Sequence, residues 1–524
     1  MSEAKVRPDC HLGHILLKHM REHSEKLCQI DGATGEQETF QSALSRSIAL
    51  AKAFREVGFK SGDILAFGGQ NNLDLHIPFY AAIFNGYPVV GVDPYYKYDE
   101  IRKLFEITSP KIAFCERESY STYVNACHDL GLDTKVIIFG RGVNSLQEFL
   151  DANKDDEPEE KFMVAEFDTD AIYQFLICTS GTTGSVKVAA FHHQPATTWI
   201  TQHAYGSRAL QLDGRVVLNV SPVNWISSYF ISTVAIIAGQ CQLQSSILDN
   251  IDIIIDMINK YKPVISAMSP ALVTSLLKRK NEVNLTCFRV LAVAGAKARP
   301  ETMIELRSCM NKEALAAESY GSTETVGSIV RVTPDTPLGS CGIAYANRVM
   351  KLVDPETEEE ITEANVPGEL IVKDPGFTEY YNDPEETAKV FRPDGFFKTG
   401  DLLYRDENNF YFYVDRIKTL IKYRNFHIQP SELEDVIKAN QDVSDVCVIG
   451  VDNPEDGQHP VACIVPRDGA TVTRQEIKQL VSGKLSKQKE LRGGVVFLKE
   501  LPRTSTGKIA RKKLLELVLN SKRE

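Results

Sequence analysis

The chain lacks the closely spaced cysteine pairs of zinc-binding or redox sites, although it has 11 cysteines in 524 residues. An odd, scattered set of cysteines indicates reduced thiols in an intracellular protein rather than a disulfide framework. The chain also lacks a surplus of positive charge, because 59 lysines and arginines face 70 aspartates and glutamates. The resulting net charge of -11 argues against general nucleic-acid binding, which needs a basic surface.

Signals for membranes and organelles are also missing. Residues 1–26 carry charges and no long apolar stretch, so they do not predict a signal peptide. Residues 216–248 contain no charge and are long enough to span a bilayer, but their asparagines, glutamines and proline favour a buried strand, a loop and a core helix. The chain ends in Ser-Lys-Arg-Glu rather than the peroxisomal Ser-Lys-Leu, so we expect a cytoplasmic rather than a peroxisomal protein.

Strand-like and helix-like patterns alternate over the first four hundred residues. An apolar stripe that ends at Gly58 predicts a helix, and strand-like runs follow at 64–67, 111–115 and 135–139. We expect Asn71 and Asn72 to cap the helix after the first of these strands. The alternation predicts an α/β fold with crossover helices, and the length predicts two or more domains.

Turn signals become frequent beyond residue 331. This change predicts a β-rich subdomain over 331–401, inside an N-terminal domain of residues 1–414, and a small α+β domain over 415–524. In the small domain, Ser431 is the predicted N-cap of a helix, and Glu434 completes its capping box. Thr473 is predicted to begin a second helix.

A hydroxyl-rich glycine loop follows the strand-like run 172–178. Residues 180–187 read Ser-Gly-Thr-Thr-Gly-Ser-Val-Lys. Glycines let the backbone approach a phosphate, hydroxyl and N–H groups donate hydrogen bonds, and the lysine adds positive charge. The loop is not a Walker A motif, because it lacks the Gly-Lys-Ser/Thr ending. Taken alone, it fits an ordinary glycine, serine and threonine turn equally well.

Four further polar clusters follow, and each of them singly fits a solvated loop. They read Glu-Ser-Tyr-Gly-Ser-Thr-Glu at 318–324, Gly-Phe-Phe-Lys-Thr-Gly-Asp at 395–401, Asp-Arg-Ile-Lys-Thr-Leu-Ile-Lys at 415–422 and Arg-Thr-Ser-Thr-Gly-Lys at 503–508. Together and in this order, the five motifs resemble the adenylate-forming superfamily of acyl-CoA synthetases, firefly luciferase-like proteins and coumarate-CoA ligases. Residues 420–423 and 491–497 resemble luciferase-like acyl-CoA synthetases of insects most closely.

This resemblance implies both a fold and an activity. The implied fold is a large N-terminal domain of stacked αβαβα layers with a β-rich subdomain and a small mobile C-terminal domain. The implied activity joins a fatty or other hydrophobic carboxylic acid to CoA with ATP and Mg²⁺, through an acyl-adenylate and with release of pyrophosphate and AMP. Such a reaction needs positioned cations and donors, because negative charge spreads in the transition state. The oligomeric state is not indicated.

The resemblance also assigns residues. Those matching the family's ATP- and AMP-binding positions are Ser180, Gly181, Thr182, Thr183, Gly184, Lys187, Gly295, Ala296, Ser319, Tyr320, Gly321, Asp401 and Arg416. The loop residues match the phosphate-holding positions, Tyr320 belongs to the adenine slot, and Asp401 matches the acid that binds the ribose. Arg416 matches a second contact to ribose or phosphate.

Four residues match catalytic positions of the family. Thr323 matches a hydroxyl that contacts phosphate, and Glu324 matches the Mg²⁺ ligand, a hard oxygen donor for a hard cation. Lys508 matches the lysine that bridges the substrate carboxylate and the α-phosphate. Lys422 matches the lysine that serves thioester formation after the small domain has rotated about a hinge near Asp415.

The sequence departs from the family pattern at three places. Val186 and Val188 flank the loop lysine where the family has proline and glycine. Asn224 and Trp225 stand at the acyl-substrate gate, where the family has an aromatic residue or His-His followed by glycine. Asn425 replaces a glycine of the loop that lines the family's pantetheine tunnel, which puts the use of CoA in question.

Two other functions therefore stay open. One is a luciferase-like monooxygenase, which the missing His-His-Gly-Phe run disfavours. The other is a catalytically weakened protein that binds a nucleotide or an acyl group. The altered loop and gate favour it, and the intact Glu324, Asp401, Lys422 and Lys508 disfavour it. Trp225 itself fits either a reshaped acyl tunnel or ordinary core packing.

Overall fold

A computed structural model describes residues 10–154, 157–180, 186–209, 215–247, 250–424, 426–504 and 508–522. The chain forms two compact units. The larger unit comprises Met1–Gly181, Val186–Val349 and Lys373–Phe397, and the smaller unit combines Met350–Val372 with Lys398–Glu524. The domain boundary at residue 415 stays a prediction.

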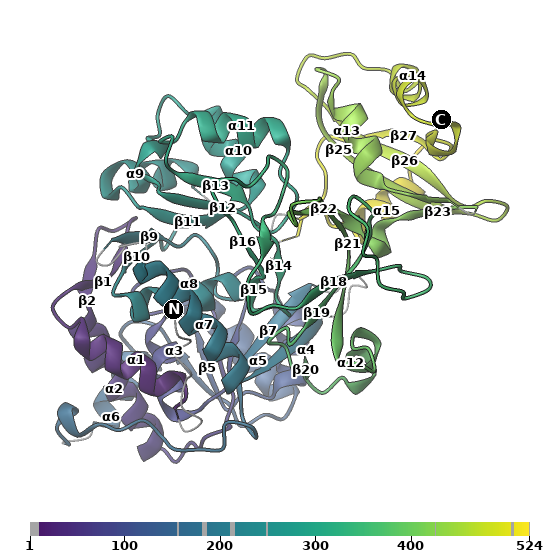
Figure 1. Ribbon diagram of the computed structural model, residues 1–524. Coiled ribbons are helices and arrows are strands. Elements are labelled where there is room, and N and C mark those ends of the chain that lie inside the picture. The colour runs from purple at the N-terminus through teal and green to yellow at the C-terminus, as the bar shows by residue number, and fades with distance from the viewer. Residues whose placement is uncertain are drawn as a thin grey trace. The chain divides into compact units, whose positions relative to one another are not determined.

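Two seven-stranded sheets build the larger unit (Figure 1). The first sheet has the strand order β20 (Glu379–Tyr380), β8 (Val186–His192), β7 (Tyr173–Ser180), β4 (Val89–Gly91), β3 (Leu65–Phe67), β5 (Ile112–Cys115) and β6 (Lys135–Ile138). The second has the order β13 (Leu315–Glu318), β12 (Val290–Val293), β11 (Ile265–Met268), β9 (Val216–Leu218), β10 (Cys241–Gln244), β1 (Leu27–Asp31) and β2 (Gln37–Thr39). Most neighbouring strands run parallel, as crossover helices require.

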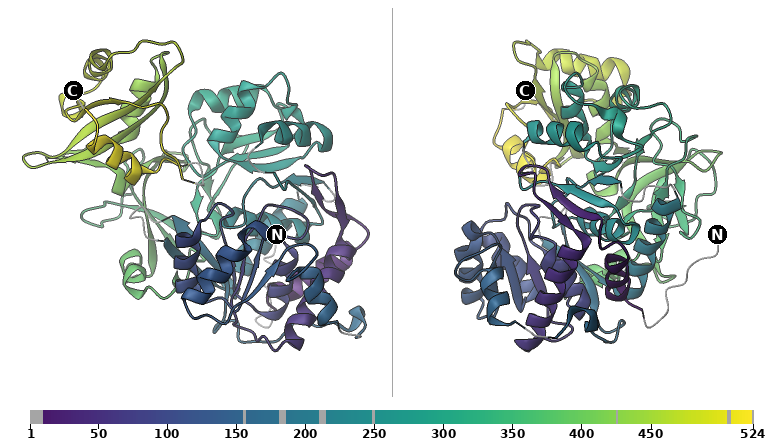
Figure 2. Two further views of the ribbon diagram at one scale, coloured as in Figure 1. Left: turned by 180° about the vertical axis from the view of Figure 1, so that it is seen from behind. Right: turned by 90° about the vertical axis from the view of Figure 1, so that its left-hand side faces the viewer.

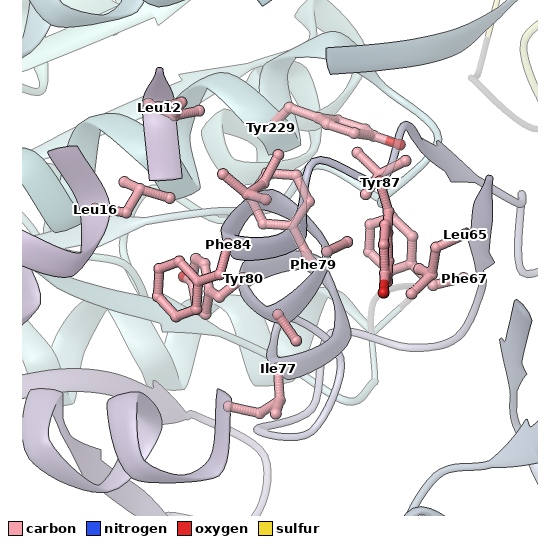
Figure 3. Close-up of a cluster of buried hydrophobic side chains, with 14 of the residues drawn as sticks. Leu12, Leu16, Leu65, Phe67, Ile77, Phe79, Tyr80, Phe84, Tyr87 and Tyr229 are labelled. Atoms are coloured by element: carbon pink, nitrogen blue, oxygen red, sulfur yellow. The ribbon is translucent and has the colours of Figure 1, made fainter. Parts of the chain in front are cut away.

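Both faces of the first sheet are apolar. Leu65 and Phe67 join one buried cluster, and Ala66 between them joins another, because side chains alternate along a strand. The first cluster takes in helices α1 (Leu12–Glu22), α2 (Phe40–Glu56), α3 (Ile77–Asn85), α7 (His193–Ala209) and α8 (Ile226–Ala238). The second takes in α4 (Tyr98–Thr108) and α5 (Tyr120–Asp129). Figure 3 shows α3 at the centre of the first cluster, with Leu65 and Phe67 of β3 on one side and Leu12 and Leu16 of α1 on the other.

The second sheet is apolar on one face and polar on the other. Helices α9 (Ile251–Tyr261), α10 (Pro270–Lys278) and α11 (Pro300–Ser308) share a buried apolar cluster with this sheet. On the opposite face, the buried Gln244 side chain donates to the Gln29 side chain at 3.1 Å, and Gln29 donates to Glu38 at 2.5 Å. The predicted α/β fold with stacked αβαβα layers is confirmed by these two sheets and their helices.

Short elements complete the larger unit. They are α6 (Leu146–Ala152), β14 (Gly321–Ser322), β15 (Gly327–Ser328), β16 (Val330–Arg331), β17 (Ile343–Ala344) and α12 (Pro384–Val390). Residues 216–247 form β9, α8 and β10, which confirms the predicted strand and core helix. Across the described ranges, every helix is too short or too polar to cross a membrane.

The smaller unit contains two sheets in which most neighbouring strands run antiparallel. One consists of β18 (Met350–Val353), β19 (Gly368–Lys373), β21 (Phe396–Arg405) and β22 (Tyr411–Arg416). The other consists of β24 (Phe426–Ile428), β23 (Ile421–Tyr423), β26 (Gly457–Pro466), β25 (Val443–Asn453) and β27 (Gly494–Phe497). One face of this second sheet packs on α13 (Pro430–Lys438) and α14 (Arg474–Lys484), and the other face packs on α15 (Arg511–Leu519). Figure 2 shows this sheet and its helices from two further sides.

The predicted cap at Asn71 and Asn72 is wrong. Helix α3 begins only at Ile77, after His76. The Asn72 side chain instead accepts the N–H groups of Asp74 and Leu75, at 2.9 and 3.1 Å, which stabilises a turn. A proline in the first turn, with its fixed φ, favours the later start of the helix.

The two predicted caps of the small domain have different outcomes. Helix α13 begins at Pro430 with Gln429 as N-cap, so the prediction for Ser431 is wrong. Glu434 does not complete a capping box, because it accepts the N–H of Val448 at 2.7 Å. Thr473 is confirmed as the N-cap of α14, and it forms a capping box.

Candidate active site

The carboxyl ends of β12 and β13 bring two predicted site segments together. In this parallel pair Val293 lies opposite Glu318, and the Ser319 N–H donates to the Val293 carbonyl at 2.9 Å. The chain leaves β12 toward Gly295 and leaves β13 toward Tyr320, so these residues lie at the same edge of the sheet. Open parallel sheets bind ligands at this edge.

The turn after β12 is fixed by a buried carboxylate. Glu318 accepts the Ala298 N–H at 2.9 Å, and burial raises the pKa of the Glu318 carboxyl above its ordinary value. Gly295 has a φ of 92°, which a residue with a side chain would adopt only under strain. Gly295 and Ala296 are exposed, and Tyr320 is buried. The turn therefore presents backbone and small side chains at the sheet edge, as an adenine slot would need.

A tight hairpin holds Thr323 and Glu324. Strands β14 and β15 pair Gly321 with Ser328. A Cβ atom at Gly321 would lie only 1.9 Å from the carbonyl oxygen of Gly327, so only glycine fits there. Thr323 and Glu324 occupy the turn of this hairpin and are both half-buried.

Glu324 and Lys187 are linked through Tyr380. The Tyr380 hydroxyl donates to Glu324 Oε1 at 2.9 Å, and Lys187 Nζ lies 4.8 Å from the centroid of the Tyr380 ring. Lys187 also forms an ion pair with Glu386. Strand β20 pairs Tyr380 with Ala189 of β8, which places the tyrosine beside the strand that carries Lys187. We call Glu324, Tyr380, Lys187 and Glu386 the contact series.

Sequence reasoning missed Tyr380 and Glu386. The sequence Asp383-Pro384-Glu385-Glu386 is typical of a helix start and predicts α12, which begins at Pro384 with Asp383 as N-cap. It does not predict the ion pair between Glu386 and Lys187, because the two residues are far apart in the sequence. Tyr380 was missed because β20 has only two residues and so has no recognisable sequence pattern.

The predicted gate residues lie at the start of α8. Buried Asn224 donates to Asp93 Oδ2 at 2.9 Å, and Trp225 is half-buried. The backbone here approaches β4 closely, since a Cβ atom at Gly91 would lie 2.0 Å from the Val223 carbonyl oxygen. Asn224 therefore contributes a structural contact, and the gating role of both residues stays a prediction.

The smaller unit carries four predicted residues. Asp401 and Arg416 lie opposite each other on β21 and β22, and Arg416 Nε is 2.9 Å from Asp401 Oδ1. Lys422, on β23, and Lys508 are both exposed and lie on separate segments. The Lys508 carbonyl accepts the Thr504 N–H at 2.8 Å.

Ser180 is held by backbone pairing, and Ser319 has a side-chain hydrogen bond. Ser180 pairs with Val186 in the β7–β8 ladder, and the Ser319 hydroxyl donates to Ser328 Oγ at 2.8 Å. The predicted residues Gly181, Thr182, Thr183, Gly184 and Asn425 lie outside the described residues.

The chain belongs to the AMP-binding enzyme family. Residues 16–382 match the model of AMP-binding enzymes, and residues 432–508 match the model of the AMP-binding enzyme C-terminal domain. The superfamily inferred from the five motifs is thereby confirmed.

Known relatives extend over nearly the whole chain. Luciferin 4-monooxygenase of Photuris pensylvanica is 28% identical over 502 residues, covering 92% of this chain and 90% of the relative. Probable 4-coumarate–CoA ligase 2 of Dictyostelium discoideum is 26% identical, covering 98% and 96%. The crystal structure of ATP-bound MatB from Rhodopseudomonas palustris superposes with a TM-score of 0.86 at 24% identity, covering 97% and 99%, which shows the same fold.

Proposed function

We propose that the protein is an ATP-dependent acid–CoA ligase that activates a fatty or other hydrophobic carboxylic acid. The contact series is the main support for this proposal, because Lys187 and Glu324, which are far apart in the sequence, both contact Tyr380. Both are groups that the family motifs assign to phosphates and to Mg²⁺. The resemblance to coumarate ligases supports CoA as the acceptor.

The first half-reaction needs charge stabilisation more than covalent catalysis. The acid's carboxylate attacks the α-phosphate of ATP, the bond to pyrophosphate breaks, and an acyl-adenylate forms. In this proposal Lys187 holds the outer phosphates and Lys508 stabilises the charge that develops between carboxylate and α-phosphate. Asp401 binds the ribose hydroxyls, and Arg416 makes a second contact to ribose or phosphate.

The residues near Glu324 fit a magnesium ion. Glu324 is half-buried, offers a hard oxygen ligand, and has the Thr323 hydroxyl as its neighbour. Bound there, Mg²⁺ would neutralise phosphate charge during the displacement.

In the second half-reaction the thiol of CoA attacks the acyl carbonyl and AMP leaves. Lys422 serves this step in the proposal. Its exposed side chain, on a segment separate from Lys508, is consistent with a different task for each lysine.

A panel of carboxylic acids, assayed for pyrophosphate release with and without CoA, tests the proposal. We expect pyrophosphate with hydrophobic acids and an acyl-CoA product by mass spectrometry. Light emission with luciferin and O₂ would instead favour a luciferase-like monooxygenase. A melting temperature that rises with ATP, without pyrophosphate release for any acid, would favour a weakened binding protein.

A further inference from the structure

The ammonium group of Lys187 is held by groups from within the chain. Its side chain is only 11% exposed, and Glu386, 28% exposed, forms the ion pair with it. A largely buried ammonium needs a counterion, because burial disfavours its charge. Glu386 is the anion that meets this need.

Glu386 has a second cation. Its Oε1 atom lies 2.5 Å from the Nζ of Lys389, while Oε2 faces Lys187. Hydrogen bonds from Lys187 and then Lys389 lower the pKa of the Glu386 carboxyl to about 2, so it is ionised at any ordinary pH. Glu386 would therefore keep a partner if Lys187 turned toward another anion.

Tyr380 lies beside both Lys187 and Glu324. Its ring lies against Lys187 while its hydroxyl is bound by Glu324. Its backbone N–H donates to Thr387 Oγ1 at 2.9 Å, which ties Tyr380 to the helix that carries Glu386. Tyr380 therefore contacts the lysine, the proposed metal ligand and the helix that carries the counterion.

We propose that Glu386 is an internal counterion that competes with the outer phosphates of ATP for Lys187 and so sets the affinity for ATP. This role rests on the phosphate-binding role proposed for Lys187. Binding of the nucleotide must exchange one anion at Lys187 for another, and Lys389 makes this exchange less costly by keeping Glu386 paired. Removing the Glu386 charge should therefore strengthen binding.

Glu386→Gln and Glu385→Gln form a matched pair, because Glu385 is an exposed neighbour in the same helix and loses the same charge. We expect Glu386→Gln to lower the Kd for ATP and for inorganic tripolyphosphate by about two- to fivefold, within the range of a partly exposed ion pair. The Kd for AMP should not change, since AMP lacks the outer phosphates. Glu385→Gln should match wild type throughout.

Two further variants test the mechanism. In a Lys187→Met background, Glu386→Gln should have no effect on ATP binding. Lys389→Met, at a side chain 63% exposed, should weaken binding of ATP and tripolyphosphate more than of AMP, because Glu386 then keeps Lys187 as its sole partner. Calorimetry gives each Kd, and a thermal melt confirms folding. If Glu386→Gln failed to fold, Lys389→Met would test the counterion role instead: a higher Kd for ATP would support it, and an unchanged or lower Kd would overturn it.

An unchanged or higher Kd for ATP in Glu386→Gln, or an equal change for AMP, would overturn the counterion role. If wild type forms acyl-adenylate and Glu386→Gln behaves like Glu385→Gln, the counterion role alone is wrong. If the expected binding pattern is found but no acid yields pyrophosphate, the ligase function alone is wrong. Absence of binding to both ATP and tripolyphosphate would overturn both.

Discussion

The proposed catalytic groups are arranged differently in the two units. In the larger unit Glu324, Tyr380, Lys187 and Glu386 contact one another in series. In the smaller unit Lys422 and Lys508 are exposed on separate segments. Groups in contact change one another's environment when one is substituted, whereas separated groups act independently. Substitutions within the contact series should therefore couple, whereas those of Lys422 and Lys508 should act independently.

The largest effect should come from the two lysines. We expect Lys508→Ala to reduce acyl-adenylate formation by about 10²–10³-fold, as for loss of one donor that stabilises a developing charge. The same variant should still convert supplied acyl-adenylate and CoA to the thioester. Lys422→Ala should show the reverse, and single-turnover assays of each half-reaction measure both.

Lys512→Ala, at another exposed lysine of the smaller unit, is the control and should leave both half-reactions unchanged. Equal losses of both half-reactions in Lys508→Ala and Lys422→Ala would contradict the separate roles proposed for the two lysines. If wild type forms the adenylate but never uses CoA, another acceptor takes the acyl group.

A smaller loss is expected at the metal ligand. Glu324→Gln should lower the rate of adenylate formation at least tenfold, about 1.4 kcal/mol, because an amide is a weaker ligand for Mg²⁺ than a carboxylate. Chelation of divalent ions should stop wild-type activity, and Mg²⁺ should restore it. A wild-type rate in the variant would contradict the assignment of Glu324.

Tyr380→Phe tests coupling within the contact series. Loss of the hydrogen bond to Glu324 should lower the rate about three- to tenfold, since a typical intramolecular hydrogen bond contributes roughly 0.5–1.5 kcal/mol. In a Glu324→Gln background the same substitution should have a much smaller effect. Additive losses in this double-mutant cycle would show that the larger unit is no more coupled than the smaller one.

Trp225→Ala should have the smallest effect on rate and should change the choice of acid instead. If the indole limits the acyl site, its removal admits longer acids, each added methylene contributing about 0.8 kcal/mol, or roughly fourfold in kcat/KM. A series of acids of increasing length measures the shift. An unchanged profile in a folded variant would place Trp225 in the core and outside the acyl site.

Local patterns explain what the sequence could predict. Continuous stretches of sequence form β3, β5 and α8, so the apolar pattern of each stretch predicted it. The cap at Thr473 was likewise predicted from adjacent residues. The caps at Asn72 and Ser431 were wrong because each side chain has another partner, the Asp74 N–H for Asn72 and the Val414 carbonyl for Ser431. Prolines in the first turns of both helices also favour the observed starts.

The candidate site was only partly predictable for a related reason. Motif order placed Lys187 and Glu324, but the link between them passes through Tyr380, on a strand of two residues. Its contacts arise from antiparallel pairing with β8, which no local pattern encodes. The roles of the site residues stay predictions until the variants are measured.

The pairing of β1 with β10 has a consequence for biosynthesis. Strand β1 ends at Asp31, and its parallel partner β10 begins only at Cys241. At a synthesis rate of about 5–20 residues per second, the early hairpin of β1 and β2 waits roughly 10–40 s for that partner to emerge. During this interval the β1 edge is open to pairing with any other extended strand. If the chain folds during synthesis, the second sheet cannot be completed before Gln244 has been made.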